Sequence, residues 1–297
     1  VELWCPSPTQ LKILGWLEND PRFDQPVTPV DQLGSISSEK WVRVAGSVHS
    51  QKLGQEVVLR DATGQVTLHT ALAKTLEPGT AIEAIGQPQA DGLRMVLNQA
   101  LYRRVDQMVP TPEVRGLPIL RLAEQVRELP VEEAGRGYPV RLRGVITWSD
   151  PNARFFYVRD VSAGLRIERT DWQGEIPVAG ARVDLNGRSA VGEFAPVVLL
   201  ENLSSTGTLP LPEPPETTLQ HLMSGVEDSQ SVAVSGYVRT VFSDGKWSRL
   251  EITTPTGALV VHLPRDARVS DLAGSVVRVR GVCAVRANDR RQLNAVQ

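Results

Sequence analysis

The sequence predicts an all-β chain of three tandem five-stranded barrels with short connecting helices. Strands of alternating apolar residues recur around Gly46, Gly144 and Gly236, and two further alternating strands joined by a tight turn follow each of them. Alternation with a period of two is typical of antiparallel strands with one buried face. The three glycines lie 98 and 92 residues apart, which fits a small domain copied in tandem and is too long for a solenoid repeat.

Composition places the chain among folded globular proteins. Its 297 residues allow two or three domains; aromatic residues are few, at 5%, and the 22% of charged residues is ordinary. No apolar run reaches the 18 residues that indicate a membrane span. Cys5 and Cys283 lie at opposite ends of the sequence, so they predict neither a disulfide framework nor a metal motif, and their redox state stays open.

Helical segments and proline-rich spacers are expected to separate the barrels. Leucines at helical spacing follow Thr9, an expected N-cap, and Thr217 or Thr218 is the expected N-cap of the last such helix. Pro130 is expected to end the middle helix and to begin another turn, and the proline-rich stretches favour extended, semi-rigid spacers. A lead-in with a short helix is expected at 1–35, and barrels are expected at 36–108, 131–207 and 226–297. Linkers with helices are expected between them, at 109–130 and 208–225. The third barrel is expected to end inside its fifth strand.

Glycine and aspartate positions define the expected strands further. Gly144 stands in the middle of its strand and is expected to mark a bend, because glycine has no Cβ to crowd a neighbouring strand. A tight turn is expected at 61–64, with Gly64 at positive φ, and Asp61 and Asp160 occupy matching turn positions. Fifth strands are expected at 93–100, at 195–203 and from 291 onward.

Five strands in this order, a bent first strand and a helical segment resemble the OB-fold, a small Greek-key barrel. The second copy, with LPVEEAGRGYPV at 129–140 followed by VRLRGVIT and FYVRDVSAGLRI, also resembles the tandem OB-like repeats found outside the membrane in bacterial sensor histidine kinases. The first copy lacks the proline before its opening strand, and the third has Thr254 and Pro255 where that pattern has Asp. The resemblance implies a sensor domain in bacterial signal transduction, periplasmic or extracellular and part of a membrane-anchored protein.

The sequence holds no catalytic or metal-binding motif. None of the four histidines belongs to a local metal motif, and there is no P-loop, no GxGxxG and no GxSxG. His69 and His262 stand at equivalent strand ends and are expected to be solvated, and the acidic pairs 132–133 and 227–228 are expected to be helix caps or solvated faces. The sequence therefore predicts no enzymatic activity, no metal and no cofactor.

Candidate binding residues lie on the outer faces of the second and third copies. Phe156 and Val158 are expected to point into the second barrel, so that their neighbours point outward. OB-folds bind oligomers on the face of strands 2 and 3, where aromatic and arginine side chains stack on bases or sugars. The same side chains would equally pack on a neighbouring repeat. The predicted binding residues are Trp148, Phe155, Tyr157, Arg159, Arg166, Phe242 and Trp247.

Two functions stay open on this sequence. The favoured interpretation is a non-enzymatic binding, sensory or spacer region of a larger bacterial surface or signalling protein, whose partner is an unidentified ligand, a glycan, a protein or a second copy of itself. The alternative is a single-stranded nucleic-acid-binding protein. Residues 230–297 carry ten basic and five acidic residues and support the alternative, but the richest aromatic face falls on the balanced second copy. Membrane contact is expected only through flanking segments, because the sequence begins at Val1 and is expected to be a fragment or a processed chain.

Overall fold

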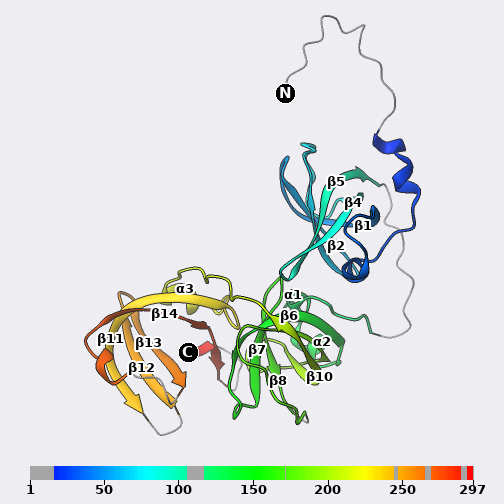
Figure 1. Cartoon of the computed structure of the whole chain (residues 1–297). Helices are drawn as coiled ribbons and strands as arrows, with labels where there is room; N and C mark the ends of the chain where they lie inside the picture. Colours follow the sequence, from blue (N-terminus) through cyan, green and yellow to red (C-terminus); the bar gives the residue numbers. More distant parts are fainter. Residues whose placement is uncertain are drawn as a thin grey trace, which may run out of the picture. The chain divides into compact units, whose positions relative to one another are not determined.

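The computed structural model describes residues 17–105, 117–170, 172–243, 247–264, 269–288 and 293–296. The predicted all-β class is confirmed. The chain divides into two compact units, Val1–Glu113 and Val114–Gln297, which are taken one at a time below. The described part of the first unit holds one closed barrel; that of the second holds another closed barrel and a further curled sheet (Figure 1).

The first barrel has the strand order of an OB-fold. Its strands close in the order β1-β2-β3-β5-β4, and β3 and β5 are the parallel pair, with Val66 opposite Met95. In the described residues before it lie the 3₁₀ segments η2 (Leu17–Asn19), η3 (Pro21–Asp24) and η4 (Val30–Ser35). The strands are β1 (Val42–Lys52), β2 (Glu56–Asp61), β3 (Gly64–His69), β4 (Ala81–Asp91) and β5 (Arg94–Arg104).

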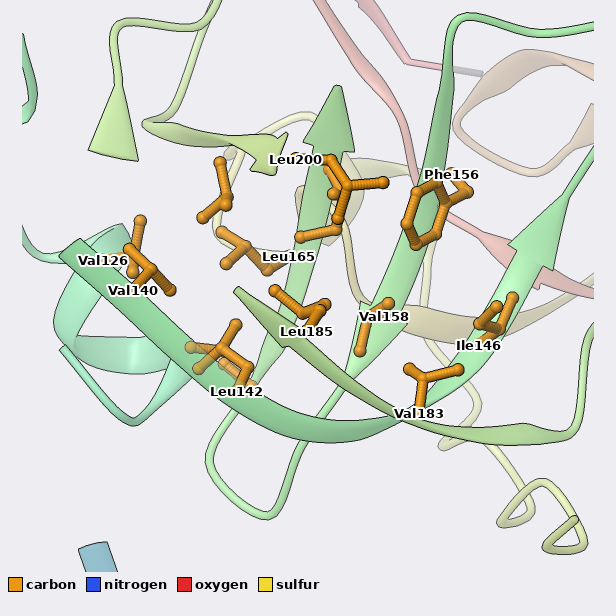
Figure 2. Packing of buried hydrophobic residues seen from close by; sticks show 14 of the residues in the cluster. Val126, Val140, Leu142, Ile146, Phe156, Val158, Leu165, Val183, Leu185 and Leu200 are labelled. Carbon is orange, nitrogen blue, oxygen red and sulfur yellow. The ribbon is translucent and has the colours of Figure 1, made fainter. Parts of the chain in front are cut away.

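The second barrel repeats this order after two short helices, α1 (Ala123–Arg127) and α2 (Val131–Ala134). Phe156, Val158 and Leu165 point into its core, as the alternation predicts, and are at most 1% exposed (Figure 2). The strands are β6 (Pro139–Ser149), β7 (Phe155–Arg159), β8 (Gly164–Glu168), β9 (Ala181–Ala190) and β10 (Val197–Thr208).

The third copy keeps the order of the first four strands. Its described residues form one sheet, β13-β12-β11-β14, and a separate two-stranded sheet, β15 with β16, where the sequence predicts a single five-stranded barrel. The fifth strand begins at Leu293, and its described part pairs with β15. The elements are α3 (Leu219–Leu222), β11 (Ser231–Ser243), β12 (Trp247–Thr254), β13 (Gly257–Pro264), η5 (Ser270–Leu272), β14 (Val276–Val282), β15 (Val285–Ala287) and β16 (Leu293–Val296).

The glycine of each first strand lies against the backbone of the second strand. A Cβ on Gly144 would lie 2.5 Å from Val158 Cγ1 and 2.7 Å from the carbonyl oxygen of Arg159. The pairing register between these strands shifts two residues further along in all three copies. The three glycines therefore occupy equivalent positions, as predicted, because two backbones approach closely there. The corresponding contacts are Gly46 with Arg60 and Gly236 with Thr253.

The turn after the second strand is made by an aspartate side chain in the first two barrels, and the expectation of a positive φ at Gly64 is wrong. Gly64 is absent from the glycines with positive φ. Instead, Asp61 Oδ1 accepts hydrogen bonds from the backbone N–H groups of Thr63 and Gly64, at 2.7 and 2.8 Å. Asp160 makes the same turn in the second barrel. The hydrogen bonds of the aspartate side chain thus form these turns without a glycine at positive φ.

The helical lead-ins are part of the barrels that follow them. Pro130 precedes α2 as predicted, and Thr218 is the N-cap of α3, with its side chain accepting from the backbone N–H of His221. Each lead-in also forms one parallel bridge to the first strand of its copy, at Val27, Leu120 and Glu216. The expected helix after Thr9 and most of the spacer at 109–118 lie outside the described residues.

Three charged side chains on the first barrel join its strands to the lead-in. Glu83 on β4 is 3% exposed and accepts hydrogen bonds from Arg43 on β1 and from Arg103 on β5. Arg103 also lies over the ring of Phe23, 4.4 Å from its centroid. Burial raises the pKa of Glu83, but the hydrogen bonds from the two arginines outweigh it, so the pKa is lower than usual.

Replacing Gly144 with valine is expected to lower the free energy of unfolding of the second unit by about 1–3 kcal/mol, because the new side chain collides with the neighbouring strand. Urea denaturation measures the change. Gly281 on β14 is the matched control, since an added Cβ there meets nothing within 4 Å. Gly281→Val is expected to change the free energy by less than about 0.5 kcal/mol. An unchanged midpoint for Gly144→Val would contradict the close approach.

Glu83 should make the first barrel sensitive to acid. Its pKa is lower in the folded chain than the ordinary 4.5, so its contribution is present above pH 4.5 and is lost as the pH falls through the folded pKa. Glu83→Gln is expected to cost about 3 kcal/mol at pH 7, because two arginines lose their counter-charge. The variant should also lose less stability on acidification than the parent chain.

Urea denaturation at pH 7 and at pH 4 tests this expectation. Glu77→Gln, at an exposed position of the same barrel, is the control and should stay within about 0.5 kcal/mol of the parent at both pH values. Equal acid sensitivity in the parent and the Glu83 variant would show that another carboxyl group is responsible.

Candidate ligand faces of the second and third copies

Four of the predicted binding residues come together on the outer face of the second barrel. The rings of Trp148 and Phe155 stack at 5.5 Å between centroids, with 23° between their planes. Tyr157 meets both rings edge-on, at 6.0 and 5.7 Å. The guanidinium carbon of Arg166 lies 4.2 Å from the Phe155 centroid. The sequence-based grouping therefore corresponds to a real cluster.

This aromatic cluster is largely occupied by its own members. Phe155 lies between the ring of Trp148 and the guanidinium of Arg166, so its faces are already covered. Arg166 also pairs with Glu168 at 3.2 Å. Tyr157 points out of the barrel but is only 4% exposed, and burial raises the pKa of its hydroxyl. A ligand would have little free aromatic surface to stack on here.

The chain segment 226–230, which leads into the third copy, covers this face. The Gln230 amide accepts from Gly164 N at 2.9 Å and donates to Gly164 O at 3.2 Å. Arg159 Nη1 donates to the same amide oxygen at 3.2 Å, so this predicted binding residue serves the joint between the copies. A Cβ on Gly164 would collide with the carbonyl oxygen of Ser229. For Tyr157 and Arg159, packing on a neighbouring repeat is the observed role.

A buried ion pair lies beside this joint. Asp228, expected to be a cap or a solvated residue, is 8% exposed, and its Oδ1 accepts from Val285 N at 3.0 Å. Arg127 Nη1 lies 3.9 Å from Asp228 Oδ2 but donates to the main-chain oxygen of Asp228 at 2.5 Å. Burial raises the pKa of Asp228 and lowers the pKa of Arg127. The direct hydrogen bonds, rather than the distant charge pair, therefore hold the segment.

The outer face of the third copy is more open. Phe242 on β11 lies opposite Arg249 on β12, which lies opposite His262 on β13, and opposed residues share one face of a sheet. The flanking residues Leu250 and Ile252 belong to the core, so this row faces outward. Phe242 is 57% exposed, Arg249 is exposed and His262 is half-buried. Phe242 thus stands where the sequence predicts a binding residue.

A second exposed row crosses the same sheet. Tyr237 on β11 lies between Val276 on β14 and Thr253 on β12 and is 48% exposed. Tyr237, Arg249 and His262 are functional candidates that the sequence analysis does not select. The signal that identifies them is the cross-strand register, which alternation within one strand does not supply. Trp247, also predicted to bind, begins β12, but its side chain lies outside the described part of the chain.

Part of the basic charge of the third copy is compensated within the chain. Arg280 pairs with Glu213 of the proline-rich segment at 2.5 Å, and Arg278 lies 3.7 Å from Glu213 and 3.9 Å from Glu216. Arg239 pairs with Glu251 at 3.3 Å. The excess of ten basic over five acidic residues therefore overstates the charge that a partner would meet.

Within the described ranges, no group of three or more His, Cys, Asp and Glu side chains is placed to hold a metal ion. Cys283 is a free, buried thiol, and burial raises its pKa to about 12, so it is protonated at neutral pH. A search of the described residues finds no helix with the length and apolar character to cross a membrane.

The chain matches no protein-family model and no curated protein. It is similar to the hypothetical protein ygiW from E. coli, with 22% identity and a TM-score of 0.24, over 28% of this chain and 92% of that one. The HINa domain of Ifi202 in complex with 20-bp dsDNA matches 58% of this chain and 98% of its own, at 14% identity and a TM-score of 0.25. A replication protein A heterotrimer bound to ssDNA matches 91% of this chain and 94% of its own, at 7% identity and a TM-score of 0.24. At such scores the likenesses carry no argument about function, and the OB-fold rests on the strand order itself.

Removing the Gln230 amide should loosen the joint. Gln230→Ala deletes four hydrogen bonds, and at about 1 kcal/mol for each the local opening free energy should fall by about 3–4 kcal/mol. Amide hydrogen exchange at Gly164 is the readout and should accelerate at least tenfold. Gln220→Ala, at an exposed position of α3, is the control and should leave that rate unchanged. Unaltered exchange in Gln230→Ala would mean that the amide does not hold the joint.

Proposed function

We propose that this chain is a non-enzymatic binding protein whose ligand face is the outer surface of the third copy, and that the ligand is a single strand of nucleic acid. The outward-facing row of Phe242, Arg249 and His262, in which Phe242 and Arg249 are exposed, carries the proposal. It lies on the strands that correspond to the oligomer-binding face of OB-folds.

Two interactions would act together on this face. Aromatic side chains stack on bases irrespective of sequence, with about 1–3 kcal/mol for each base, and arginine neutralises phosphate. Tyr237 and Phe242 stand about 16 Å apart along β11 at about 3.3 Å per residue, and Arg239 and Arg249 lie near them on neighbouring strand positions. Aromatic and basic residues thus share the third copy, although the richest aromatic cluster lies on the second barrel, as the sequence predicts.

The outer faces of the other copies support the third as the binding face. In the second barrel, residues 226–230 cover Tyr157 and engage Arg159. In the first barrel, the corresponding row is Lys52, Glu56 and His69, and Lys52 pairs with Glu56 at 2.6 Å. Neither face combines an exposed phenylalanine or tyrosine ring with an exposed arginine.

A sensory or spacer role outside the cytoplasm is the second candidate. The joint at 226–230 favours it, because a second barrel and third copy held by directional hydrogen bonds would transmit a change of orientation instead of absorbing it. The resemblance to sensor-kinase repeats supports the same role. The flanking gene sequence tests it: a secretion signal upstream and a membrane span with a kinase domain downstream are expected for this candidate.

Titration with labelled single-stranded oligothymidine tests the nucleic-acid function. Binding in the micromolar range is expected at 0.05 M salt. With two arginines neutralising phosphates, the slope for a single strand is about −1.4, so affinity should fall about sevenfold at 0.2 M salt. Phe242→Ala should weaken binding about tenfold, because one stacking contact is lost. Arg249→Ala should weaken it and flatten the salt dependence.

Matched controls separate this face from general charge effects. Arg188→Ala removes an exposed arginine that pairs with Glu201 on the second barrel and should leave the affinity unchanged. Trp148→Ala removes a ring of the self-stacked cluster and should also leave it unchanged. Equal losses in Arg249→Ala and Arg188→Ala, or the absence of binding at 0.05 M salt, would overturn the proposed function.

A further inference from the structure

The third copy lacks a contact that the first two copies share. Asp61 Oδ2 accepts from a backbone N–H of its lead-in at 3.0 Å, and Asp160 Oδ2 does the same at 2.8 Å. Each carboxylate therefore clamps the start of a helical segment onto the turn after the second strand. Thr254 holds the equivalent position in the third copy, and its hydroxyl donates to Gly257 O at 3.0 Å within the turn.

The bridge between lead-in and first strand confirms this equivalence. The residue clamped by each aspartate stands three positions after the bridging residue of its lead-in. Counting in the same way from Glu216 leads to Leu219, the first residue of α3. The two clamped residues are Val30, which follows Val27, and Ala123, which follows Leu120.

A cavity of about 360 Å³ lies between the start of α3 and the turn of the third copy. This volume falls within the range of small-molecule sites. Leu219, Val234 and Pro255 supply apolar walls, and the lining also includes Glu216, Ser235 and Thr254. A threonine in place of the clamping aspartate is thus accompanied by an open space at the clamp position.

Three polar side chains of this cavity, Glu216, Ser235 and Thr254, offer acceptor oxygens. Ser235 Oγ donates its proton to Glu216 Oε1 at 2.7 Å, and the Thr254 hydroxyl proton is used within the turn. Both hydroxyl oxygens therefore face a ligand with lone pairs, and the Glu216 carboxylate accepts only. Arg278 Nη2 lies 3.9 Å from the second carboxylate oxygen of Glu216 and leaves that oxygen capacity for a further donor.

We propose that this cavity binds a small organic ammonium ion, with the apolar part of the ligand against Leu219, Val234 and Pro255 and the ammonium group on Glu216 and the two hydroxyls. A primary ammonium has three donors and no acceptor, and Glu216, the one charged side chain among the residues that line the cavity, supplies its counter-charge. The site is separate from the exposed rows that carry the proposed nucleic-acid function.

Titrations of the ¹⁵N-labelled full chain with n-pentylammonium, n-pentanol and n-pentanoate, followed by amide shifts, test the proposal. Pentylammonium should produce saturable shifts at Leu219 and Thr256 in the millimolar range, and pentanoate should bind at least tenfold more weakly. Glu216→Gln should weaken the binding of pentylammonium at least fivefold and leave the binding of pentanol unchanged. Glu213→Gln is the matched control, because Glu213 pairs with the same arginine but does not line the cavity, and it should change neither.

Restoring the clamp provides a second readout. Thr254→Asp should place a carboxylate against the backbone of α3, close the cavity, abolish pentylammonium binding and raise the melting temperature by about 2–4 °C. Equal affinity for pentanoate and pentylammonium, the absence of saturable shifts, or unchanged binding by Glu216→Gln would overturn the ammonium site. Tighter binding of pentylammonium to the Thr254→Asp variant would show that the new carboxylate does not close the cavity.

Discussion

The close approach of the first two strands is the constraint on which each copy depends. β1, β6 and β11 each pair with two other strands, so each must leave one partner and curve toward the other. A glycine followed by a register shift makes this curvature sterically allowed, since the neighbouring carbonyl occupies the space of a Cβ. Closure of the barrels, the enclosed apolar core and the outward direction of alternate side chains all follow from that one bend.

Much of this architecture could be predicted from the sequence, because period-two alternation and recurring glycines report local geometry directly. The turn at Gly64 could not, since Asp61 makes hydrogen bonds that remove the need for a positive φ. Tyr157 shows a different limit. Alternation correctly directs it out of its own barrel, but residues far along the chain then bury it, and a strand pattern contains no information about such a cover. The row through Arg249 escaped prediction for the related reason that register joins separate segments.

The joint between the second barrel and the third copy is formed by hydrogen bonds, which hold only in one orientation of the groups that make them. The Gln230 side chain forms hydrogen bonds with both the N–H and the carbonyl group of Gly164. Arg127 donates to the main-chain oxygen of Asp228, and the Asp228 carboxylate accepts from Val285 N. Such a network stabilises one arrangement only when its members are all satisfied, because each buried group left without a partner is costly. An apolar joint would tolerate sliding, whereas this one specifies a relative register of the two sheets.

Three copies of one fold therefore differ mainly in what covers their outer surfaces. The first barrel packs a lead-in over Glu83, the second receives the segment that starts the third copy, and the third leaves Tyr237 and Phe242 exposed. The turn position varies in the same manner, with an aspartate that clamps the lead-in in two copies and a threonine in the third. Because neither change disturbs the bend or the core, a duplicated barrel can lose contacts on its surface without losing its fold. The third copy, without these two contacts, is the one that carries the proposed ligand face.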